Sequence, residues 1–237
     1  MGALTFVRTV AVAAAACLAT LAPASAQDDT PESTRGAWHA AVAPTDGGHL
    51  IGNPDAEAKL VEFISYSCPT CALFARQGEA PLQYVFIHSG KLNLEIRPII
   101  RNNIDLAATM MVQCGATENF ARNHAMMLNS QATWLAVSRN MTAAQKARWG
   151  DGLRAEQRRA IASDLGLYGF MAARGYEQTE LDRCLNDDAR AAALDAQSNA
   201  DFERFGLEGT PSFVLDGTTL EHVHDWNSLE PKLQERF

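Results

Sequence analysis

The sequence predicts an α/β fold in which a sheet domain is interrupted by an all-helical insertion. Lys59 to Tyr66 (KLVEFISY) is rich in branched and aromatic residues, as buried strands are, and ends at a Ser-Cys-Pro turn into a helix. Residues 105–204 are rich in Ala, Leu, Met, Gln and Arg, with apolar residues at helical spacing. Strand-like residues return from Thr210 to Val223. Because strands flank the helical block on both sides, the simplest architecture is one sheet domain that carries an insertion.

Length and charge narrow the possible functions. With 237 residues, of which 47% are hydrophobic, the chain can bury a substantial core. Its formal net charge of −8 argues against nucleic acid or an anionic membrane surface as the main partner, because both bind clustered Lys and Arg. The short cluster of Arg154, Arg158 and Arg159 is expected to lie on a solvated helix face. No nucleic-acid function is therefore predicted.

Residues 1–26 have the three parts of a secretory signal peptide. Arg8 precedes an apolar stretch from Val10 to Leu21, and Ala-Ser-Ala follows. The apolar stretch is too short for a typical membrane-spanning helix, so a retained anchor is the minor alternative. We expect cleavage after Ala26 and export of the mature chain.

Residues 27–52 are predicted to be a leader segment. Asp, Ala, Pro, Ser and Gly dominate it, without sustained periodicity as far as about Thr45, and turns then surround a short Leu50-Ile51 segment. Such a segment is not expected to fold by itself.

The first strand is followed by a helix that begins at a cysteine. Pro69 suits the first helical position, where its missing N–H costs nothing, and Cys68 then becomes the N-cap residue. Pro81 is expected to kink or break the helix, which resumes as far as His88. The alternating segment Lys91 to Ile100 predicts a second strand, with a proline near its end.

The chain returns to the sheet after the helical insertion, which is assigned residues 105–204. Asp216-Gly217 is a strong hairpin signal and joins two short strands. Asp225 caps a final helix from Trp226 to Arg236, which can cover one face of the sheet. Residues 53–104 and 205–237 are therefore predicted to form the sheet domain.

Cys68 and Cys71 are the most informative residues of the sequence. A two-residue spacer on a helical turn brings two sulfurs close enough to bond, and the first thiol faces the free N–H groups and positive end of the helix dipole, which favour its thiolate. Thiolate is the nucleophile of disulfide exchange. Cys71, one turn further on, is suited to attack a mixed disulfide formed at Cys68. The pattern predicts a redox-active pair.

Metal binding is the competing chemistry, because paired thiolates also hold zinc or copper. His222 and His224 share one strand face and could complete a zinc site, although an exposed pair on a short strand is more often plain surface. A purely structural disulfide is a further alternative, but so short a loop contributes little stability. Redox function is favoured over both.

Glu62 is expected to assist the exchange. It lies six residues before Cys68 on an apolar strand, where alternation with its apolar neighbours places it at least partly inside. A buried carboxylate has a raised pKa and can accept or return the proton of Cys71. A solvated Glu at the sheet edge is the alternative.

Together these motifs resemble the DsbA branch of the thioredoxin superfamily. The shared features are CPTC between a strand and a helix, Glu62, a helical insertion, and Gly-Thr-Pro-Ser-Phe from Gly209 at the later hairpin. Asp46-Gly47-Gly48-His49 is similar to the alphaproteobacterial proteins of this type, and the match covers nearly all of the mature chain. The resemblance implies a thioredoxin-like fold, a periplasmic location, and a cis Pro211 beside the first cysteine, with the Thr210 backbone hydrogen-bonding to an extended substrate strand.

One departure concerns the residue before the second cysteine. The strongly oxidising members carry Pro-His between the cysteines, whereas this chain carries Pro69-Thr70. Thr70 can donate a hydrogen bond but cannot carry a positive charge beside the thiolate. The expected reduction potential therefore lies between about −120 mV, for the strongest oxidant, and about −270 mV, for thioredoxin.

Cys114 and Cys184 are expected to be structural. Each falls on the apolar face of a helix, so both should point into the helical block, either bonded or as separate buried thiols. Export favours a disulfide between them, because Cys17 leaves with the signal peptide and no other partner remains. Related alphaproteobacterial proteins are similar in having such a second pair.

The sequence thus predicts a periplasmic thiol-disulfide oxidoreductase that introduces disulfides into reduced exported polypeptides through Cys68 and Cys71, without a cofactor or a metal. The resemblance implies re-oxidation by a quinone-linked membrane protein. A disulfide isomerase or reductase is the nearest alternative, and a copper- or zinc-binding module is another. Isomerases of the superfamily usually oligomerise through an added N-terminal domain, for which the leader is too short, so a monomer is expected.

Overall fold

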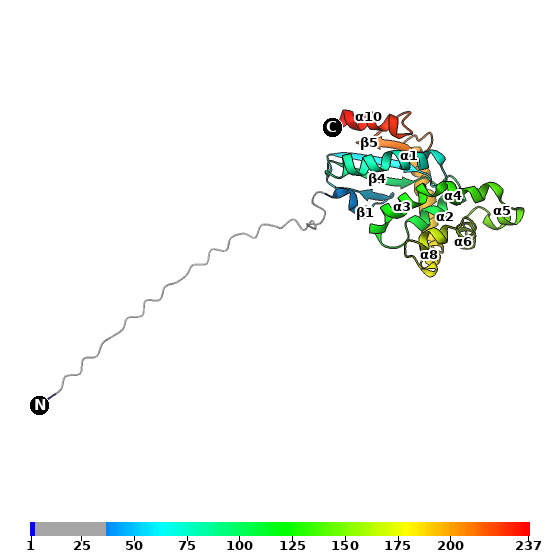
Figure 1. Ribbon diagram of the computed structural model, residues 1–237, viewed down its shortest axis with the longest axis horizontal. Helices are drawn as coiled ribbons and strands as arrows, with labels where there is room; N and C mark the ends of the chain where they lie inside the picture. The colour runs from blue at the N-terminus through cyan, green and yellow to red at the C-terminus, as the bar shows by residue number, and fades with distance from the viewer. Residues whose placement is uncertain (3–36) are drawn as a thin grey trace. The chain divides into compact units, whose positions relative to one another are not determined.

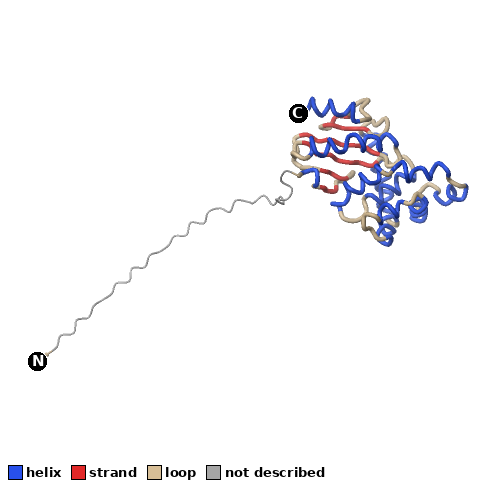
Figure 2. Tube along the Cα trace, viewed as in Figure 1, coloured by secondary structure: helices blue, strands red, loops and turns tan. Residues whose placement is uncertain are grey.

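The strands of the chain form one mixed sheet (Figures 1 and 2). The computed structural model describes residues 1–2 and 37–237, so the predicted signal-peptide features and residues 27–36 lie outside the described residues. Within residues 37–237 the sheet has six strands in the order β1-β2-β4-β3-β5-β6. β3 and β4 are parallel, and the other neighbours are antiparallel. The strands are β1 (Val42–Pro44), β2 (His49–Ile51), β3 (Ala58–Ile64), β4 (Leu92–Pro98), β5 (Ser212–Leu215) and β6 (Thr218–Thr219).

Residues 42–51, which the sequence assigned to the leader, are part of this sheet. β1 pairs with β2, and β2 pairs with β4, so that His49 lies opposite Ile96. Gly48 permits the close approach of the two segments, because a Cβ at this position would collide with the carbonyl oxygen of Ile96. Three-residue strands between turns have almost no periodicity of their own, and the pairing is therefore invisible in the sequence pattern.

The helix that begins at the CPTC motif follows the prediction closely. α1 (Pro69–Pro81) starts with Cys68 as its N-cap residue and changes at Pro81 into a π-helical segment, Leu82–Ile87. The chain then turns at Gly90, which has a positive φ of 81°. α1 packs beside the last helix, α10 (Trp226–Arg236), with the rings of Phe74 and Trp226 6.5 Å apart.

Between β4 and β5 the chain is helical, and these helices gather beside the sheet in Figure 1. The α-helices are α2 (Asn103–Val112), α3 (Phe120–Asn129), α4 (Gln131–Leu135), α5 (Ala143–Trp149), α6 (Ala155–Asp164), α7 (Leu167–Ala172), α8 (Gln178–Leu185) and α9 (Asp188–Arg204). Short 3-10 turns occur at Trp38–Ala40, Thr117–Asn119 and Ala136–Asn140. The described residues from 37 onward belong to one compact unit, and the division into a sheet domain and an insertion stays a prediction. None of the described helices has the length and apolar character needed to cross a bilayer.

One expectation about the helical block is wrong. Arg158, predicted to be solvated, is completely buried. Its guanidinium donates to the carbonyl oxygen of Leu185 and pairs with Asp188, so that the buried charge keeps polar partners. These partners lie 27 and 30 residues away in sequence, and charge pattern alone cannot indicate them.

Candidate active site

Cys68 and Cys71 lie in the first turn of α1, directly after β3. Both are free thiols; Cys68 is 5% exposed, whereas Cys71 is completely buried. The sulfur of Cys71 accepts a hydrogen bond from the backbone N–H of Ser65 at 3.5 Å. Cys68 is therefore the member of the pair that a substrate sulfur can reach, as the sequence predicts.

The surroundings separate the acidities of the two thiols. A hydrogen bond from the Cys71 thiol is the largest cause that lowers the pKa of Cys68 to about 4; the Thr210 side chain and the backbone N–H groups of Cys71 and Thr70 add to it, and burial opposes them. Burial, followed by the hydrogen bond to Cys68, raises the pKa of Cys71 well above its usual value. At neutral pH, Cys68 is thus a thiolate and Cys71 a thiol.

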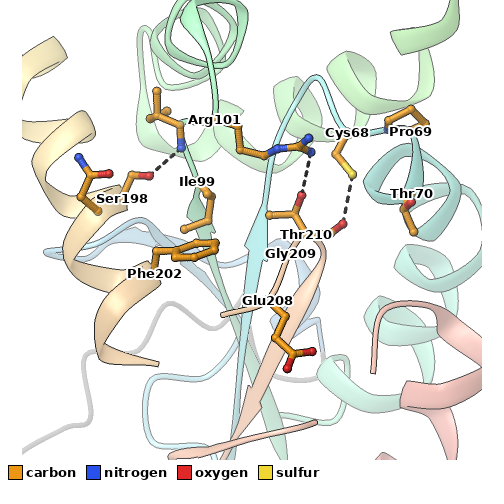
Figure 3. Close-up of a pocket in the computed structure, with 12 residues that line it drawn as sticks. Cys68, Pro69, Thr70, Ile99, Arg101, Ser198, Phe202, Glu208, Gly209 and Thr210 are labelled. Carbon is orange, nitrogen blue, oxygen red and sulfur yellow. Dashed lines mark hydrogen bonds between the residues drawn. The ribbon is translucent and has the colours of Figure 1, made fainter. Parts of the chain in front are cut away.

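The loop before β5 completes the site from the other side (Figure 3). The peptide bond between Thr210 and Pro211 is cis, and the sulfur of Cys68 lies 3.1 Å from the Thr210 carbonyl oxygen, to which the thiol donates when it is protonated. His224 Nδ1 lies 2.8 Å from the Pro211 carbonyl oxygen and donates to it in the tautomer that carries a proton on Nδ1. The half-buried His224 therefore supports this loop, whereas His222 is exposed. The sequence does not indicate this contact, because His224 and Pro211 are 13 residues apart and both histidines were expected to be surface residues or, less often, zinc ligands.

A buried carboxylate fixes the turn that precedes Cys68. Asp105, in the first turn of α2, accepts hydrogen bonds at Oδ1 from the Ser67 N–H (2.8 Å) and the Ser65 hydroxyl (2.9 Å). Its Oδ2 accepts from the Arg101 N–H at 3.0 Å. Burial raises the pKa of Asp105, and these hydrogen bonds oppose the increase. Sequence reasoning missed Asp105, because an Asp in a first helical turn usually stabilises only its own helix.

The helical block also contacts this turn through Gln131 of α4. The buried Gln131 side-chain amide donates to the carbonyl oxygens of Tyr66, at 2.7 Å, and Cys68, at 2.8 Å. These carbonyls belong to the turn between β3 and α1, and that of Cys68 also accepts a hydrogen bond from the Ala72 N–H, at 3.2 Å, in the first turn of α1. Gln131 therefore anchors the start of α1 to the helical block.

Glu62 lies in the middle of β3, opposite Phe213 of β5, and is 1% exposed. Among the residues that the structure describes, neither carboxylate oxygen has a hydrogen-bond partner. Burial raises the pKa of Glu62 well above its usual value, and the negative charge of Glu79 adds to the increase. Glu62 in turn contributes to the raised pKa of Cys71. The alternative of a solvated Glu is wrong, and the placement suits the predicted exchange of a proton with Cys71.

Cys114 and Cys184 are joined by a disulfide, the pairing that the sequence favours. The bond links the segment after α2 to α8 and lies outside the CPTC site. Within residues 37–237, no three His, Cys, Asp or Glu side chains are grouped as ligands for a metal ion.

Comparisons with known proteins agree with this geometry. The family model described as Thioredoxin matches residues 44–235. A crystal structure of a protein-disulfide isomerase from Novosphingobium aromaticivorans is 41% identical, with a TM-score of 0.78, over 81% of this chain and 98% of that one. A structure of Wolbachia pipientis alpha-DsbA1 has a TM-score of 0.62 at 18% identity, over 78% of this chain and 88% of that one. The second likeness shows a shared fold alone.

Curated relatives at lower identity come from Rickettsia. A protein of Rickettsia prowazekii, named as an inferred protein-disulfide oxidoreductase, is 26% identical over 178 residues, which are 75% of this chain and 57% of that protein. A second, from Rickettsia conorii, is 27% identical over 73% of this chain and 54% of that protein. The chain thus spans little more than half the length of these relatives.

Proposed function

The chain belongs to the thioredoxin family, and from this premise we propose that it is a protein disulfide oxidoreductase that introduces disulfides into exported proteins. The observation that carries the proposal is the position of the Cys68 thiol at the start of α1, beside the buried Cys71 and 3.1 Å from the carbonyl oxygen that precedes the cis Pro211. In this position the pKa of Cys68 is lowered to about 4. A stabilised thiolate stabilises the reduced form and makes the disulfide form a stronger oxidant. The names of the Rickettsia relatives support the same class of reaction.

In the proposed reaction, a substrate thiolate attacks the sulfur of Cys68 in the oxidised protein. The bond between Cys68 and Cys71 breaks, a mixed disulfide forms between the substrate and Cys68, and Cys71 leaves as a thiolate that takes a proton from Glu62. A second substrate thiolate then attacks the first substrate sulfur, so that the substrate disulfide forms and Cys68 leaves as a thiolate. The substrate loses two electrons, and the pair of cysteines gains them.

The setting of this reaction follows from the sequence. A signal peptide of residues 1–26 would direct the chain to the periplasm, where its substrates are reduced exported polypeptides. Each turnover leaves the pair reduced, so an oxidising partner is required, and we assign this role to a quinone-linked membrane protein. The enzyme acts as a monomer and uses no cofactor in this proposal.

Disulfide isomerisation is the second candidate, because the Novosphingobium protein of 41% identity is named an isomerase. An isomerase uses the same thiolate to attack a wrong disulfide in its substrate, and it must therefore be kept reduced. The two functions differ in reduction potential and in the substrate that is turned over.

Equilibration against glutathione buffers tests the proposal. We expect a potential for Cys68 and Cys71 well above about −270 mV, the value for thioredoxin, together with catalysed oxidation of a reduced test protein. The Cys68→Ser variant should lose this catalysis. A potential near that of thioredoxin, with faster repair of a scrambled test protein than oxidation of a reduced one, would favour the isomerase. The double variant Cys114→Ala/Cys184→Ala isolates the signal of the active-site pair.

A further inference from the structure

A groove of about 680 Å³ opens beside Cys68. Figure 3 shows that its walls come from segments far apart in sequence: the start of α1, the chain after β4, helix α9 and the loop before β5. Cys68 and Thr210 form one side of the groove, and Phe202 of α9 forms the other. A polypeptide whose sulfur reaches Cys68 must therefore place its neighbouring side chains in this groove.

Arg101 supplies a positive charge close to the nucleophile. Its guanidinium donates to the hydroxyl of Thr210 at 3.4 Å, and the carbonyl oxygen of the same threonine lies 3.1 Å from the sulfur of Cys68. Arg101 is exposed and forms no ion pair with any residue that the structure describes. Arg101 and Glu208 are the two charged residues that line the groove, and Figure 3 shows the Glu208 carboxylate pointing away from the guanidinium. The part of the groove beside Arg101 and Cys68 therefore favours an anionic group of the substrate.

Phe202 supplies an apolar surface on the opposite wall. Its side chain lies beside Ile99 in Figure 3, and both residues line the groove. Phe202 is 40% exposed, so a large part of its ring is open to solvent. An exposed aromatic ring in a concave surface is typical of contact sites for apolar side chains.

The two walls are held in place by hydrogen bonds. The Arg101 N–H donates to Asp105, which also binds the turn before Cys68. On the other side, the Ile100 N–H donates to the hydroxyl of Ser198 in α9, at 2.8 Å. The backbone segments that carry Arg101, Phe202 and Cys68 are therefore held relative to one another before a substrate arrives, which lowers the entropic cost of binding.

We propose that this groove selects polypeptides whose reacting cysteine is flanked by an acidic and an apolar side chain. The carboxylate lies against Arg101, and the apolar side chain lies against Phe202. A basic side chain in the first position meets a like charge. The selection rests on the proposed disulfide exchange at Cys68 and adds a class of substrate to it.

Reduced dithiol peptides of one length test the charge selection. One set of peptides has Glu or Lys before the first cysteine, and a second set has it after. The protein oxidises them with oxidised glutathione as the terminal oxidant, and kcat/KM is measured for each peptide. In at least one set we expect the Glu peptide to be preferred about fivefold, the size that an exposed ion pair allows. Arg101→Glu should reverse the order and Arg101→Lys should keep it. Arg183→Glu, an exposed position on α8 outside the groove, makes the same change in net charge and should leave the preference unchanged.

A second comparison tests the apolar wall. Peptides with Leu beside the cysteine should be oxidised with a higher kcat/KM than peptides with Ser there. Phe202→Ala should reduce the ratio of the Leu value to the Ser value. Val137→Ala is the matched control, because Val137 is 38% exposed and does not line the groove. High salt should weaken the charge preference and leave the apolar preference in place. Equal rates for all peptides would overturn the selection alone, whereas no oxidation of any peptide would overturn the proposed function itself.

Discussion

The sulfur of Cys68 lies 3.1 Å from the carbonyl oxygen of Thr210, although 142 residues separate the two in sequence. They meet because β3, which ends just before Cys68, is paired with β5, which begins just after Thr210. The register of this strand pair, with Phe63 opposite Ser212, therefore sets the position of the nucleophile against the loop that we propose to bind substrate.

The acidity of Cys68 can be measured directly. In the reduced protein, alkylation of Cys68 by iodoacetamide should rise with pH around a midpoint near 4, because the pKa of this thiol is lowered to about 4. Thr210→Val should move the midpoint upward, since the Thr210 side chain is one cause of the low pKa, and Thr210→Ser should retain it. Mass spectrometry of quenched samples reports the modified cysteine. A midpoint near the ordinary value of about 8.5 would contradict the geometry of the site.

The low pKa also makes the stability of the reduced form depend on pH. Between about pH 4 and about pH 8.5 the unfolded chain binds the Cys68 proton more tightly than the folded chain, so stability rises with pH in this window. This contribution to the free energy of unfolding is fully present above the pKa of Cys68 in the unfolded chain, and it is lost as pH falls through the pKa of Cys68 in the folded chain. Urea unfolding of the reduced and oxidised protein at pH 4, 6 and 8 measures this contribution, in the Cys114→Ala/Cys184→Ala background. The reduced form should gain stability relative to the oxidised form as the pH rises. The gain should disappear in Cys68→Ser.

Replacement of Glu62 should raise stability and lower activity. Its pKa is raised well above the usual value by burial, so the folded state is favoured when the carboxyl is protonated. That advantage is fully present below the unfolded pKa of about 4.3 and declines by about 1.4 kcal/mol per pH unit above it, until the folded pKa is reached. The Glu62→Leu variant should therefore have a higher free energy of unfolding than the wild type, and this difference should be larger at pH 8 than at pH 4. Loss of the proton donor to Cys71 should slow exchange on the order of 100-fold. An unchanged rate would remove Glu62 from the mechanism.

The second cysteine pair should affect stability and leave the chemistry intact. The disulfide joins residues separated by 70 positions, and its removal should lower the free energy of unfolding by about 2–4 kcal/mol. Denaturant unfolding of Cys114→Ala/Cys184→Ala under non-reducing conditions measures this loss. The glutathione potential of the active-site pair should match the wild-type value.

Asp105 should be required for the shape of the active-site turn. Asp105→Ala leaves the buried donors of Ser65 and Ser67 without their acceptor, and we expect a loss of about 2–3 kcal/mol in the free energy of unfolding. Asp105→Asn retains one acceptor oxygen and should lose less. Because the same carboxylate binds the Arg101 N–H, Asp105→Ala should also reduce the preference for Glu peptides. If Asp105→Ala keeps the full preference for Glu peptides over Lys peptides, Arg101 is positioned without the help of Asp105.

Structural features that depend on residues close together in the chain could be predicted from the sequence. The N-cap position of Cys68, the change of helix type at Pro81 and the hairpin at Asp216 each depend on local backbone chemistry, and the structure contains them. The burial of Glu62 could be inferred from alternation along one strand. In each case the residues that determine the structure are neighbours in sequence.

Features that depend on partners distant in sequence could not be predicted. β2 joins the sheet by pairing with β4, forty or more residues further on, and β1 joins it by pairing with β2; both strands are too short to show a pattern. Asp105 reaches across 38 residues to the backbone of Ser67, and His224 reaches back 13 residues to Pro211. A single sequence shows that such side chains are polar, but it does not show which segment they will contact.

If the proposed exchange at Cys68 takes place, the protein also contains a bond of the kind on which it acts, between Cys114 and Cys184. Cys114 is 3% exposed, whereas Cys184 is only partly buried, so the more open approach to this bond leads to the sulfur of Cys184. A thiolate from a neighbouring copy would therefore have to attack from the side of α8.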